Sequence, residues 1–237
     1  MNGRTTATAL GGGHTADPAV PWRRAAVRGE SRWPTVIAVV AASGLQMALP
    51  GWLSLGPHWL APALELGLLC ALVASSPGRL ERRSAALRAG GLALAGLLSL
   101  ANAISAALLV NELVHGYRKE SAAALLLAGG SIWAVNVLIF ALWYWELDRG
   151  GPADRRHAVR QYPDFLFPQM QQPDVAPPSW TPFFADYLHL SFTNAISFAA
   201  SDVIPLTRWA KMMMMLQSAV SVAAIALVVA RAVSIFH

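Results

Sequence analysis

Charged side chains are scarce in this sequence. Of its 237 residues, 13% are charged and 55% are hydrophobic, whereas soluble domains carry about 25% charged residues. Several long runs hold no charge at all, and a helix needs about 20 apolar residues to cross the hydrocarbon core of a bilayer. The composition therefore excludes a water-soluble domain and predicts an integral membrane protein whose main partner is the lipid bilayer.

Cysteine is almost absent as well. The one cysteine, Cys70, lies inside an apolar run, which excludes a disulfide framework and a cysteine-based metal site. Glu112 and His115 have the Glu-x-x-His spacing of di-iron bundles, but the second such motif and the further acids of that site are missing. We therefore expect no metal site and no cofactor.

Motifs of catalysis and of nucleic-acid binding are missing too. The sequence contains no GxSxG, no HExxH and no P-loop, so we expect a protein that is not an enzyme. The formal net charge is +5, but the arginines lie between apolar segments and form no contiguous basic face of the kind that nucleic acid requires. We expect no nucleic-acid partner.

What the chain does contain is a series of apolar segments that divide it into four regions. Residues 1–33 have five arginines and no apolar core, which predicts a disordered basic tail. Residues 34–147 hold four predicted spans, at about 35–52, 59–76, 89–114 and 122–147. Residues 148–182 are rich in proline and predict an extramembrane loop, and residues 183–237 predict a helix pair. The fold class is all-α, a polytopic transmembrane helix bundle with five or six spans.

The proline-rich loop also carries aromatic side chains. Phe165, Phe167 and Trp180 lie among six prolines of this region. Aromatic rings prefer the interface between lipid and water. We expect these three side chains to lie on the lipid headgroups.

The orientation follows from the positions of lysine and arginine, because basic loops stay on the cytoplasmic side. Six spans with both termini inside place 14 of the 18 basic residues in the cytoplasm. Five spans with a helix that re-enters from the cytoplasm place 15 there. Both arrangements predict a multi-pass protein of the cell inner (plasma) membrane with a cytoplasmic N-terminus.

The segment from Phe183 to Ala200 is the ambiguous one. Its 18 residues are barely enough to cross, and Asp186, His189 and Thr193 share one face at helical spacing. A polar stripe of this kind fits a span that faces the bundle, and it also fits a re-entrant helix that lines water. The sequence favours a true span and leaves the re-entrant helix open.

Polar residues at membrane depth are the candidate functional residues, because they are costly there. Glu65 lies about two turns inside its span, where protonation, a partner or contact with water lowers its cost. Asn102, Asn136 and Gln46 lie within other spans. They fit either a polar pathway for an ion or small solute, or hydrogen bonds between helices worth roughly 1 kcal/mol each. The complete set of pathway candidates is Glu65, Asn102, Asn136, Asp186, His189, Thr193, Asn194, Ser197, Ser201 and Asp202.

Small residues recur every fourth position in one span and every third or fourth position in another, and such stripes let two helices approach closely. They are Gly91, Ala95, Ser99, Ala103 and Ala107 in one span, and Ala219, Ala223, Ala226 and Ala230 in the last. Packing within one bundle explains them, and a homo-oligomer is the alternative.

Two short motifs near the end of the chain resemble a known pore module. LSFT (190–193) is followed by SDVIPLT (201–207), a basic residue and a long apolar helix. This order resembles the pore helix, filter and inner helix of two-span potassium channels. Ala199 and Ser201 stand where that filter has glycines, which turn its carbonyl groups toward the ion.

Longer motifs resemble another group of proteins. They are LWYWELDRGGP (142–152), DFLFPQM (164–170) and DYLHLSFTNAISFAASDVIPLTRWAK (186–211). They resemble uncharacterised bacterial, largely actinobacterial, multi-pass membrane proteins. This resemblance implies a membrane architecture and implies no activity.

Two functional hypotheses follow from the sequence. The first is a passive ion or small-solute conduit that uses the helix pair of residues 183–237. The second is a non-catalytic scaffold or interaction subunit that uses the small-residue helix faces.

Overall fold

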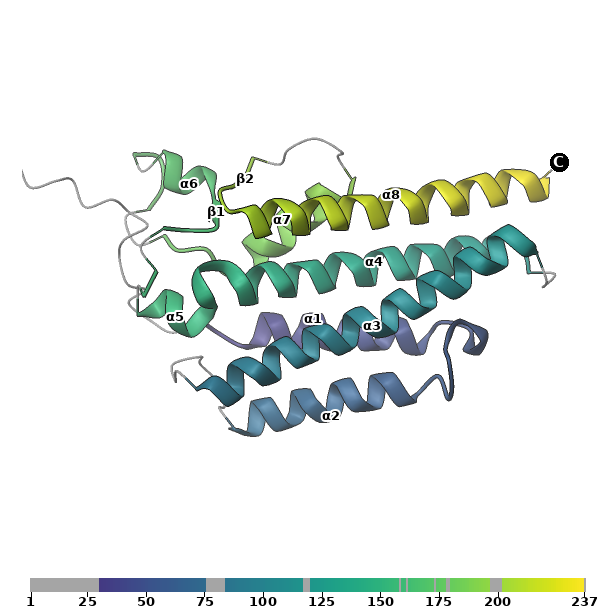
Figure 1. The fold of residues 1–237 in the computed structure, drawn as a ribbon, viewed down its shortest axis with the longest axis horizontal. Helices are drawn as coiled ribbons and strands as arrows, with labels where there is room; N and C mark the ends of the chain where they lie inside the picture. The colour runs from purple at the N-terminus through teal and green to yellow at the C-terminus, as the bar shows by residue number, and fades with distance from the viewer. Residues whose placement is uncertain are drawn as a thin grey trace, which may run out of the picture.

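In a computed structural model of the chain, the helices run alongside one another in an elongated bundle (Figure 1). The residues that the structure describes are 30–75, 84–116, 120–157, 159–160, 162–172, 174–177, 180–196 and 202–236. Within them the chain forms eight α-helices and one pair of two-residue strands. The prediction of an all-α fold is confirmed.

The long elements follow the apolar segments of the sequence. They are α1 (Trp33–Met47), α2 (Leu60–Ser75), α3 (Ala85–His115), α4 (Ala122–Leu147), α7 (Phe184–Ile196) and α8 (Arg208–Phe236). By length and composition α3, α4 and α8 are able to cross a membrane, and α1 and α2 are shorter apolar helices. The short elements are η2 (Gly51–Leu53), η3 (Asp148–Gly150), α5 (Pro152–Arg156), β1 (Phe165–Leu166), α6 (Pro168–Gln171) and β2 (Ile204–Pro205).

Local signals set the ends of the two longest apolar helices before residue 150. The side chains of Ser84 and Ser121 accept hydrogen bonds from the backbone N–H groups of Leu87 and Ala124 in the first turns of α3 and α4. Such caps satisfy N–H groups that have no partner inside the helix. At the other end of α3, Gly116 adopts the left-handed conformation with φ 64°, which glycine reaches without strain.

Helix α4 is the centre of the bundle. It packs against α1, α3, α7 and α8, and in Figure 1 it runs through the middle of the molecule. Ile132, Val135 and Ala141 are buried on it. A helix that is apolar on every side belongs in an interior, which accounts for the position of α4.

The helix α7 enters the bundle and stops part-way. Its 13 residues extend only about 20 Å at 1.5 Å per residue, whereas the hydrocarbon core is about 30 Å thick. Tyr187, near the start of α7, donates a hydrogen bond to Asp148 at the end of α4. The chain then returns to the same end of the bundle, because the backbone N–H of Leu206 donates to the carbonyl oxygen of Asp164 at 2.8 Å.

The short strand pair fixes this return. Phe165 pairs with Pro205 and Leu166 pairs with Ile204, in antiparallel register. The segment before α8 is thereby joined to the segment that follows α5. The described part of residues 183–200, α7, is shorter than a full span, and its start and the later strand β2 lie at the same end of the bundle. This arrangement favours the re-entrant alternative, and whether residues 183–200 cross the membrane stays a prediction.

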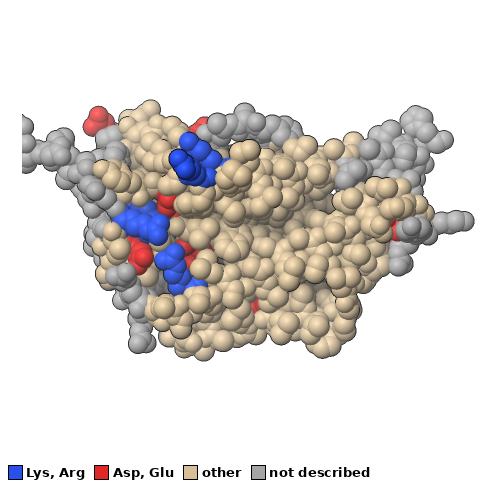
Figure 2. Space-filling view, in the orientation of Figure 1, with Lys and Arg blue, Asp and Glu red and all other residues tan. Residues whose placement is uncertain are grey.

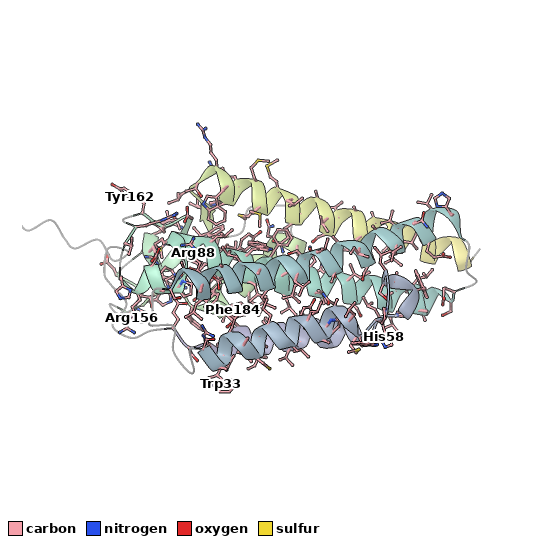
Figure 3. The ribbon with its side chains drawn as sticks, turned by 60° about the horizontal axis from the view of Figure 1, so that its bottom comes forward. Trp33, His58, Arg88, Arg156, Tyr162 and Phe184 are labelled. Atoms are coloured by element: carbon pink, nitrogen blue, oxygen red, sulfur yellow. The ribbon has the colours of Figure 1, made fainter. Side chains whose placement is uncertain are left out.

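The Lys and Arg side chains that the structure describes gather at one end of the bundle. We call it the basic end: α1, α3, α7 and α8 begin there, and α4 ends there. On the face shown in Figure 2 the blue side chains lie at this end. Arg88, Arg156 and Tyr162 lie there in Figure 3, and His58 lies at the other end. The basic residues concerned are Arg32, Arg88, Arg149, Arg155, Arg156, Arg160, Arg208 and Lys211. Their placement in the cytoplasm stays a prediction.

The proline-rich region differs from its expected position. Phe165 and Phe167 are 0% and 2% exposed, so they do not lie on the headgroups. Phe165 contacts the rings of Tyr144 and Trp209, and Phe167 contacts Tyr187. We call the described residues of 148–182 the cap, because they pack into the bundle at the basic end.

The turn between α4 and α5 depends on a glycine. Gly151 has φ 98° and ψ 175°, a conformation that only glycine adopts readily. A Cβ atom at this position would lie 2.9 Å from the backbone carbonyl oxygen of Glu146. The backbone here therefore has no room for a side chain.

We expect Gly151→Ala to lower the free energy of unfolding by about 1–3 kcal/mol, because the alanine is strained in this conformation. Gly96→Ala in α3 is the matched control, since a Cβ there meets nothing within 4 Å and alanine favours a helix by about 1 kcal/mol. Denaturation in detergent micelles measures both. Equal stability of the two variants would contradict the role of Gly151.

The re-entrant geometry is testable by cysteine labelling in a Cys70→Ala background. We expect Asp202→Cys to react with a membrane-impermeant maleimide from the same side as Arg160→Cys at the basic end. Leu55→Cys is the control for the opposite side, since Leu55 is 78% exposed in the loop between α1 and α2. Labelling of Asp202→Cys from the side of Leu55→Cys would mean that residues 183–200 span the membrane.

Candidate functional site

Glu65 is fully buried between α1 and α2. Its carboxylate accepts a hydrogen bond from the hydroxyl of Ser43 at 2.6 Å. With its amide nitrogen turned toward Glu65, Gln46 donates to both carboxylate oxygens at 2.8 and 3.2 Å. All three side chains come from neighbouring helices, so this cluster joins α1 to α2.

The two asparagines in mid-span lie at other interfaces. The amide of Asn102 on α3 donates to the backbone carbonyl oxygen of Ile132 on α4 at 3.3 Å. The amide of Asn136 on α4 donates to the hydroxyl of Ser221 on α8 at 3.2 Å. Both asparagines are buried and act as hydrogen-bond bridges between helices.

The polar stripe of α7 faces away from the bundle. His189 is exposed, and Asp186 and Thr193 are half-buried. Asp186 accepts a hydrogen bond from the backbone N–H of Phe183, and the hydroxyl of Thr193 donates to the carbonyl oxygen of His189. Both are local contacts, within α7 or with the residue just before it.

The buried face of α7 carries a polar network that connects it to α4 and α8. The amide oxygen of Gln217 on α8 accepts hydrogen bonds from Tyr144 at 2.6 Å and from Asn194 at 2.9 Å. Its amide nitrogen donates to the hydroxyl of Ser191 at 2.7 Å, and Ser191 donates to the carbonyl oxygen of Val137. The C-terminal half of α7 is therefore held by hydrogen bonds on both sides.

The remaining candidates follow α7 in the sequence. Ser197 and Ser201 lie outside the described residues. Asp202 is exposed at the basic end, just before β2. The candidates that the structure describes are thus distributed over separate interfaces, and it does not bring them together into one polar path.

The strongest polar cluster joins the start of α1 to the end of α4. The guanidinium group of Arg155, which is 4% exposed, donates to both carboxylate oxygens of Glu30, at 2.9 and 3.0 Å. Trp145 donates to the same carboxylate at 2.6 Å. Arg155 also donates to the backbone carbonyl oxygens of Trp145 and Asp148. We call this group of residues the Arg155 clamp.

Electrostatics keep the clamp charged. Burial acts to lower the pKa of the Arg155 guanidinium, but the carboxylate of Glu30 raises it, and the pKa ends above its usual value. Removal of Glu30 leaves the buried guanidinium without its paired carboxylate, and removal of Arg155 leaves the largely buried carboxylate without its cation.

A second cluster of carboxylates continues the clamp into the cap. Asp148 accepts hydrogen bonds from Tyr187 at 2.7 Å and from the backbone N–H of Asp164 at 2.9 Å. Asp164 in turn accepts from Trp209 on α8 and from the backbone N–H of Arg149. These bonds connect α4, the cap, α7 and α8 in one network.

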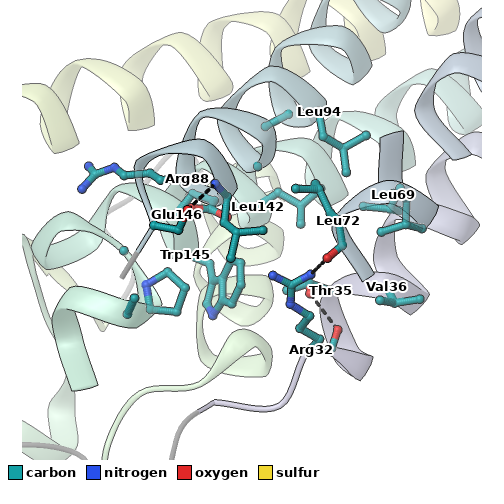
Figure 4. Close-up of a pocket in the computed structure, with 18 of the residues that line it drawn as sticks. Arg32, Thr35, Val36, Leu69, Leu72, Arg88, Leu94, Leu142, Trp145 and Glu146 are labelled. Carbon is teal, nitrogen blue, oxygen red and sulfur yellow. Dashed lines mark hydrogen bonds between the residues drawn. The ribbon is translucent and has the colours of Figure 1, made fainter. Parts of the chain in front are cut away.

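Beside the clamp, α1 to α4 enclose a pocket of about 490 Å³ that α5 and the turn before it also border (Figure 4). Its volume lies within the ~300–1,000 Å³ of small-molecule sites. The walls are mainly apolar, and the charged residues in the lining are Arg32, Arg88, Glu146 and Asp154. The apolar part of the lining includes Val36, Val39, Leu69, Leu72, Leu94 and Leu142.

The charged residues of the pocket are not all paired. Arg88 forms an ion pair with Asp154 at 3.6 Å. Arg32 donates through Nη1 to the carbonyl oxygen of Leu72 at 2.6 Å, as Figure 4 shows, but its buried Nε has no hydrogen-bond partner. Burial lowers the pKa of the Arg32 guanidinium, and the charge of Glu146 opposes this change. The pocket therefore contains a buried cation that is incompletely satisfied.

Two glycines of α3 leave room for the carboxylate of Glu146 in the pocket wall. A Cβ atom on Gly91 of α3 would collide with Oε1 of Glu146, and a Cβ atom on Gly90 would lie 2.6 Å from Leu72 of α2. The absence of side chains at both positions lets α2 and the carboxylate lie directly against α3.

The small-residue stripes are only partly used inside the bundle. On α3, Ala95 is 2% exposed and Ser99 accepts a hydrogen bond from Trp143 of α4 at 2.9 Å, whereas Ala103 and Ala107 are exposed. On α8 the exposed members are Ala219, Ala223 and Ala226. A homo-oligomer through these faces stays a prediction.

Sequence reasoning missed the residues that form the clamp and the pocket. Glu30 and Arg32 fall in the segment predicted as a disordered tail, and Glu146 and Arg155 lie at the border of the loop. No local spacing connects them, since Glu30 and Arg155 are 125 positions apart. Sequence reasoning also missed Gln217 of the network between α4, α7 and α8. This residue had a signal that sequence reasoning could have used, because it is a polar amide inside an apolar helix.

No protein-family profile, no curated protein and no solved structure matches this chain. The resemblance to the bacterial multi-pass membrane proteins stays a prediction. Among the described residues, no three His, Cys, Asp or Glu side chains are placed to hold a metal ion.

We expect Arg155→Ala to lower the free energy of unfolding by about 3–5 kcal/mol, because it leaves the carboxylate of Glu30 buried without its cation. Arg208→Ala is the control, since Arg208 is exposed at the start of α8 and its loss should change stability by less than ~0.5 kcal/mol. Denaturation in detergent micelles checks both values. A loss for Arg155→Ala no larger than for Arg208→Ala would contradict the clamp.

Proposed function

We propose that this protein is a membrane-embedded binding protein for a small amphiphilic molecule. The observation that supports the proposal best is the pocket among α1 to α4, with its apolar walls and its charged residues at the basic end. An apolar chain fits against residues such as Val39, Leu69 and Leu94, and burial of an apolar surface contributes about 25 cal/mol per Å². The charged residues are placed to orient a polar head.

The position of the pocket in the bundle fits a ligand that comes from the bilayer. The basic end carries the described arginines, which attract the anionic groups of a membrane surface. The apolar walls extend from there along α1, α2 and α3 toward the middle of the bundle. A single-chain amphiphile therefore lies with its head at the level of the headgroups and its chain at the level of the hydrocarbon core.

The conduit predicted from the sequence has weaker support. A conduit needs polar groups that face water along one path, and the buried candidates that the structure describes bond to neighbouring helices instead, as Glu65 bonds to Ser43. Ion flux in liposomes that changes on Glu65→Gln would support the conduit. The scaffold hypothesis rests on the exposed small residues of α3 and α8 and makes no use of the pocket.

The pocket is testable by blocking its mouth. Ala85 and Ala86 are both exposed in the first turn of α3, but only Ala85 lines the pocket. We expect Ala85→Trp to weaken binding of monopalmitoylglycerol by about tenfold or more, equivalent to ~1.4 kcal/mol, and Ala86→Trp to leave it unchanged. Native mass spectrometry of the delipidated protein in detergent measures both affinities.

Three results would count against the proposal. Wild-type protein that binds neither monopalmitoylglycerol nor any other single-chain palmitoyl lipid would overturn it. Equal affinities of wild type and Ala85→Trp would place the bound lipid elsewhere on the protein. An equal loss in Ala85→Trp and Ala86→Trp would mean that added bulk on α3 disturbs the fold without any specific block of the pocket.

A further inference from the structure

Two opposite charges in the pocket are incompletely satisfied within the described part of the chain. Arg32 is 9% exposed, makes one hydrogen bond, to the backbone of Leu72, and leaves its Nε without an acceptor. No described residue makes a hydrogen bond or a contact ion pair with the carboxylate of Glu146, although Arg32, Arg88 and Arg155 act on it at longer range. Arg88 and Asp154, the other two charged lining residues, pair with each other.

The unsatisfied groups of Arg32 and Glu146 indicate which chemical groups a ligand needs. A buried N–H without an acceptor costs roughly 1–3 kcal/mol, so an acceptor oxygen from a ligand is favoured beside Arg32. Guanidinium groups bind phosphoryl oxygens particularly well, through short charge-assisted hydrogen bonds. A carboxylate accepts hydrogen bonds only, so a donor with a positive charge is favoured beside Glu146.

The charge balance of the lining argues against a head group that is only anionic. The lining holds two cations and two anions, and a ligand with net negative charge would be repelled by Glu146. A ligand with net positive charge would leave Arg32 unsatisfied and be repelled by it. A head group that carries both a phosphoryl group and a primary ammonium satisfies both side chains at once.

We propose that the pocket binds a zwitterionic single-chain lipid of the phosphoethanolamine class, with its phosphoryl group at Arg32 and its ammonium at Glu146. This inference rests on the proposed function, because it names the head group of the amphiphile that the pocket takes. The apolar chain lies against Val36, Val39 and Leu69. The clamp supports the site, since Glu30 lies two residues before Arg32 and holds the start of α1 against α4.

Four palmitoyl lipids with different heads test the assignment by native mass spectrometry. They are lysophosphatidylethanolamine, lysophosphatidylcholine, lysophosphatidylglycerol and monopalmitoylglycerol. In wild-type protein we expect the ethanolamine lipid to bind about tenfold tighter than the other three. The choline head has no N–H to donate to Glu146, the glycerol phospholipid has no cation, and monopalmitoylglycerol has neither group.

Variants separate the two contacts. Glu146→Gln should remove the preference for the ethanolamine lipid over the choline lipid. Arg32→Gln should weaken all three phospholipids by about tenfold and leave monopalmitoylglycerol unchanged. Arg208→Gln is the control for the loss of one positive charge, since it lies on α8 and outside the pocket lining, and it should change none of the four affinities. If Arg32→Gln does not fold, the Glu146→Gln comparison still decides the matter.

The failures of the two proposals are distinguishable. Equal binding of all four lipids in wild type would overturn the head-group assignment and leave the proposed function standing, and binding of none would overturn both. Variants that alter thermal stability but leave the wild-type lipid preference unchanged would show that Arg32 and Glu146 serve only the fold. Free phosphoethanolamine that displaces the ethanolamine lipid at equal concentration would identify a soluble ligand and overturn the lipid source.

Discussion

The basic end of the bundle depends on the buried guanidinium group of Arg155. Its hydrogen bonds reach Glu30 before α1 and the backbone of Trp145 and Asp148 at the end of α4. A buried charge is tolerable only when it is paired and hydrogen-bonded, so these segments cannot separate without a large cost. The clamp thereby sets the position of Arg32, and with it one wall of the pocket.

A second constraint acts deeper in the bundle, where no water is available to satisfy polar groups. Glu65, Asn102 and Asn136 each bond to a neighbouring helix, and Gln217 joins the tip of α7 to α4 and α8. The half-length helix is stable there because its buried polar groups have partners on both sides. Buried polar side chains, which line the conduction path in channels, form hydrogen bonds between helices here.

The sequence predicted the elements whose signals are local. The bounds of α4 match the predicted 122–147, whereas α3 begins at Ala85, directly after the Ser84 cap, and the apolar segment alone had placed its start at about 89. The position of β2 was not predictable in this way, because it is set by the pairing of β2 with β1, about 40 residues earlier. A short apolar helix such as α7 also looks the same in a sequence whether it spans or re-enters. The pocket was hidden for the same reason, because Arg32 and Glu146 come to line one pocket only after α1 and α4 have packed.

The most direct test of the account is to find where a lipid chain lies in the native membrane. A single-chain lipid with a photoreactive diazirine in its chain would be cross-linked to the protein in membranes, and the modified residues would be mapped by mass spectrometry. The account predicts adducts on the pocket lining, at residues such as Val36, Leu69 and Leu94. Adducts confined to outward-facing residues such as Met215 and Val222 on α8 would contradict it.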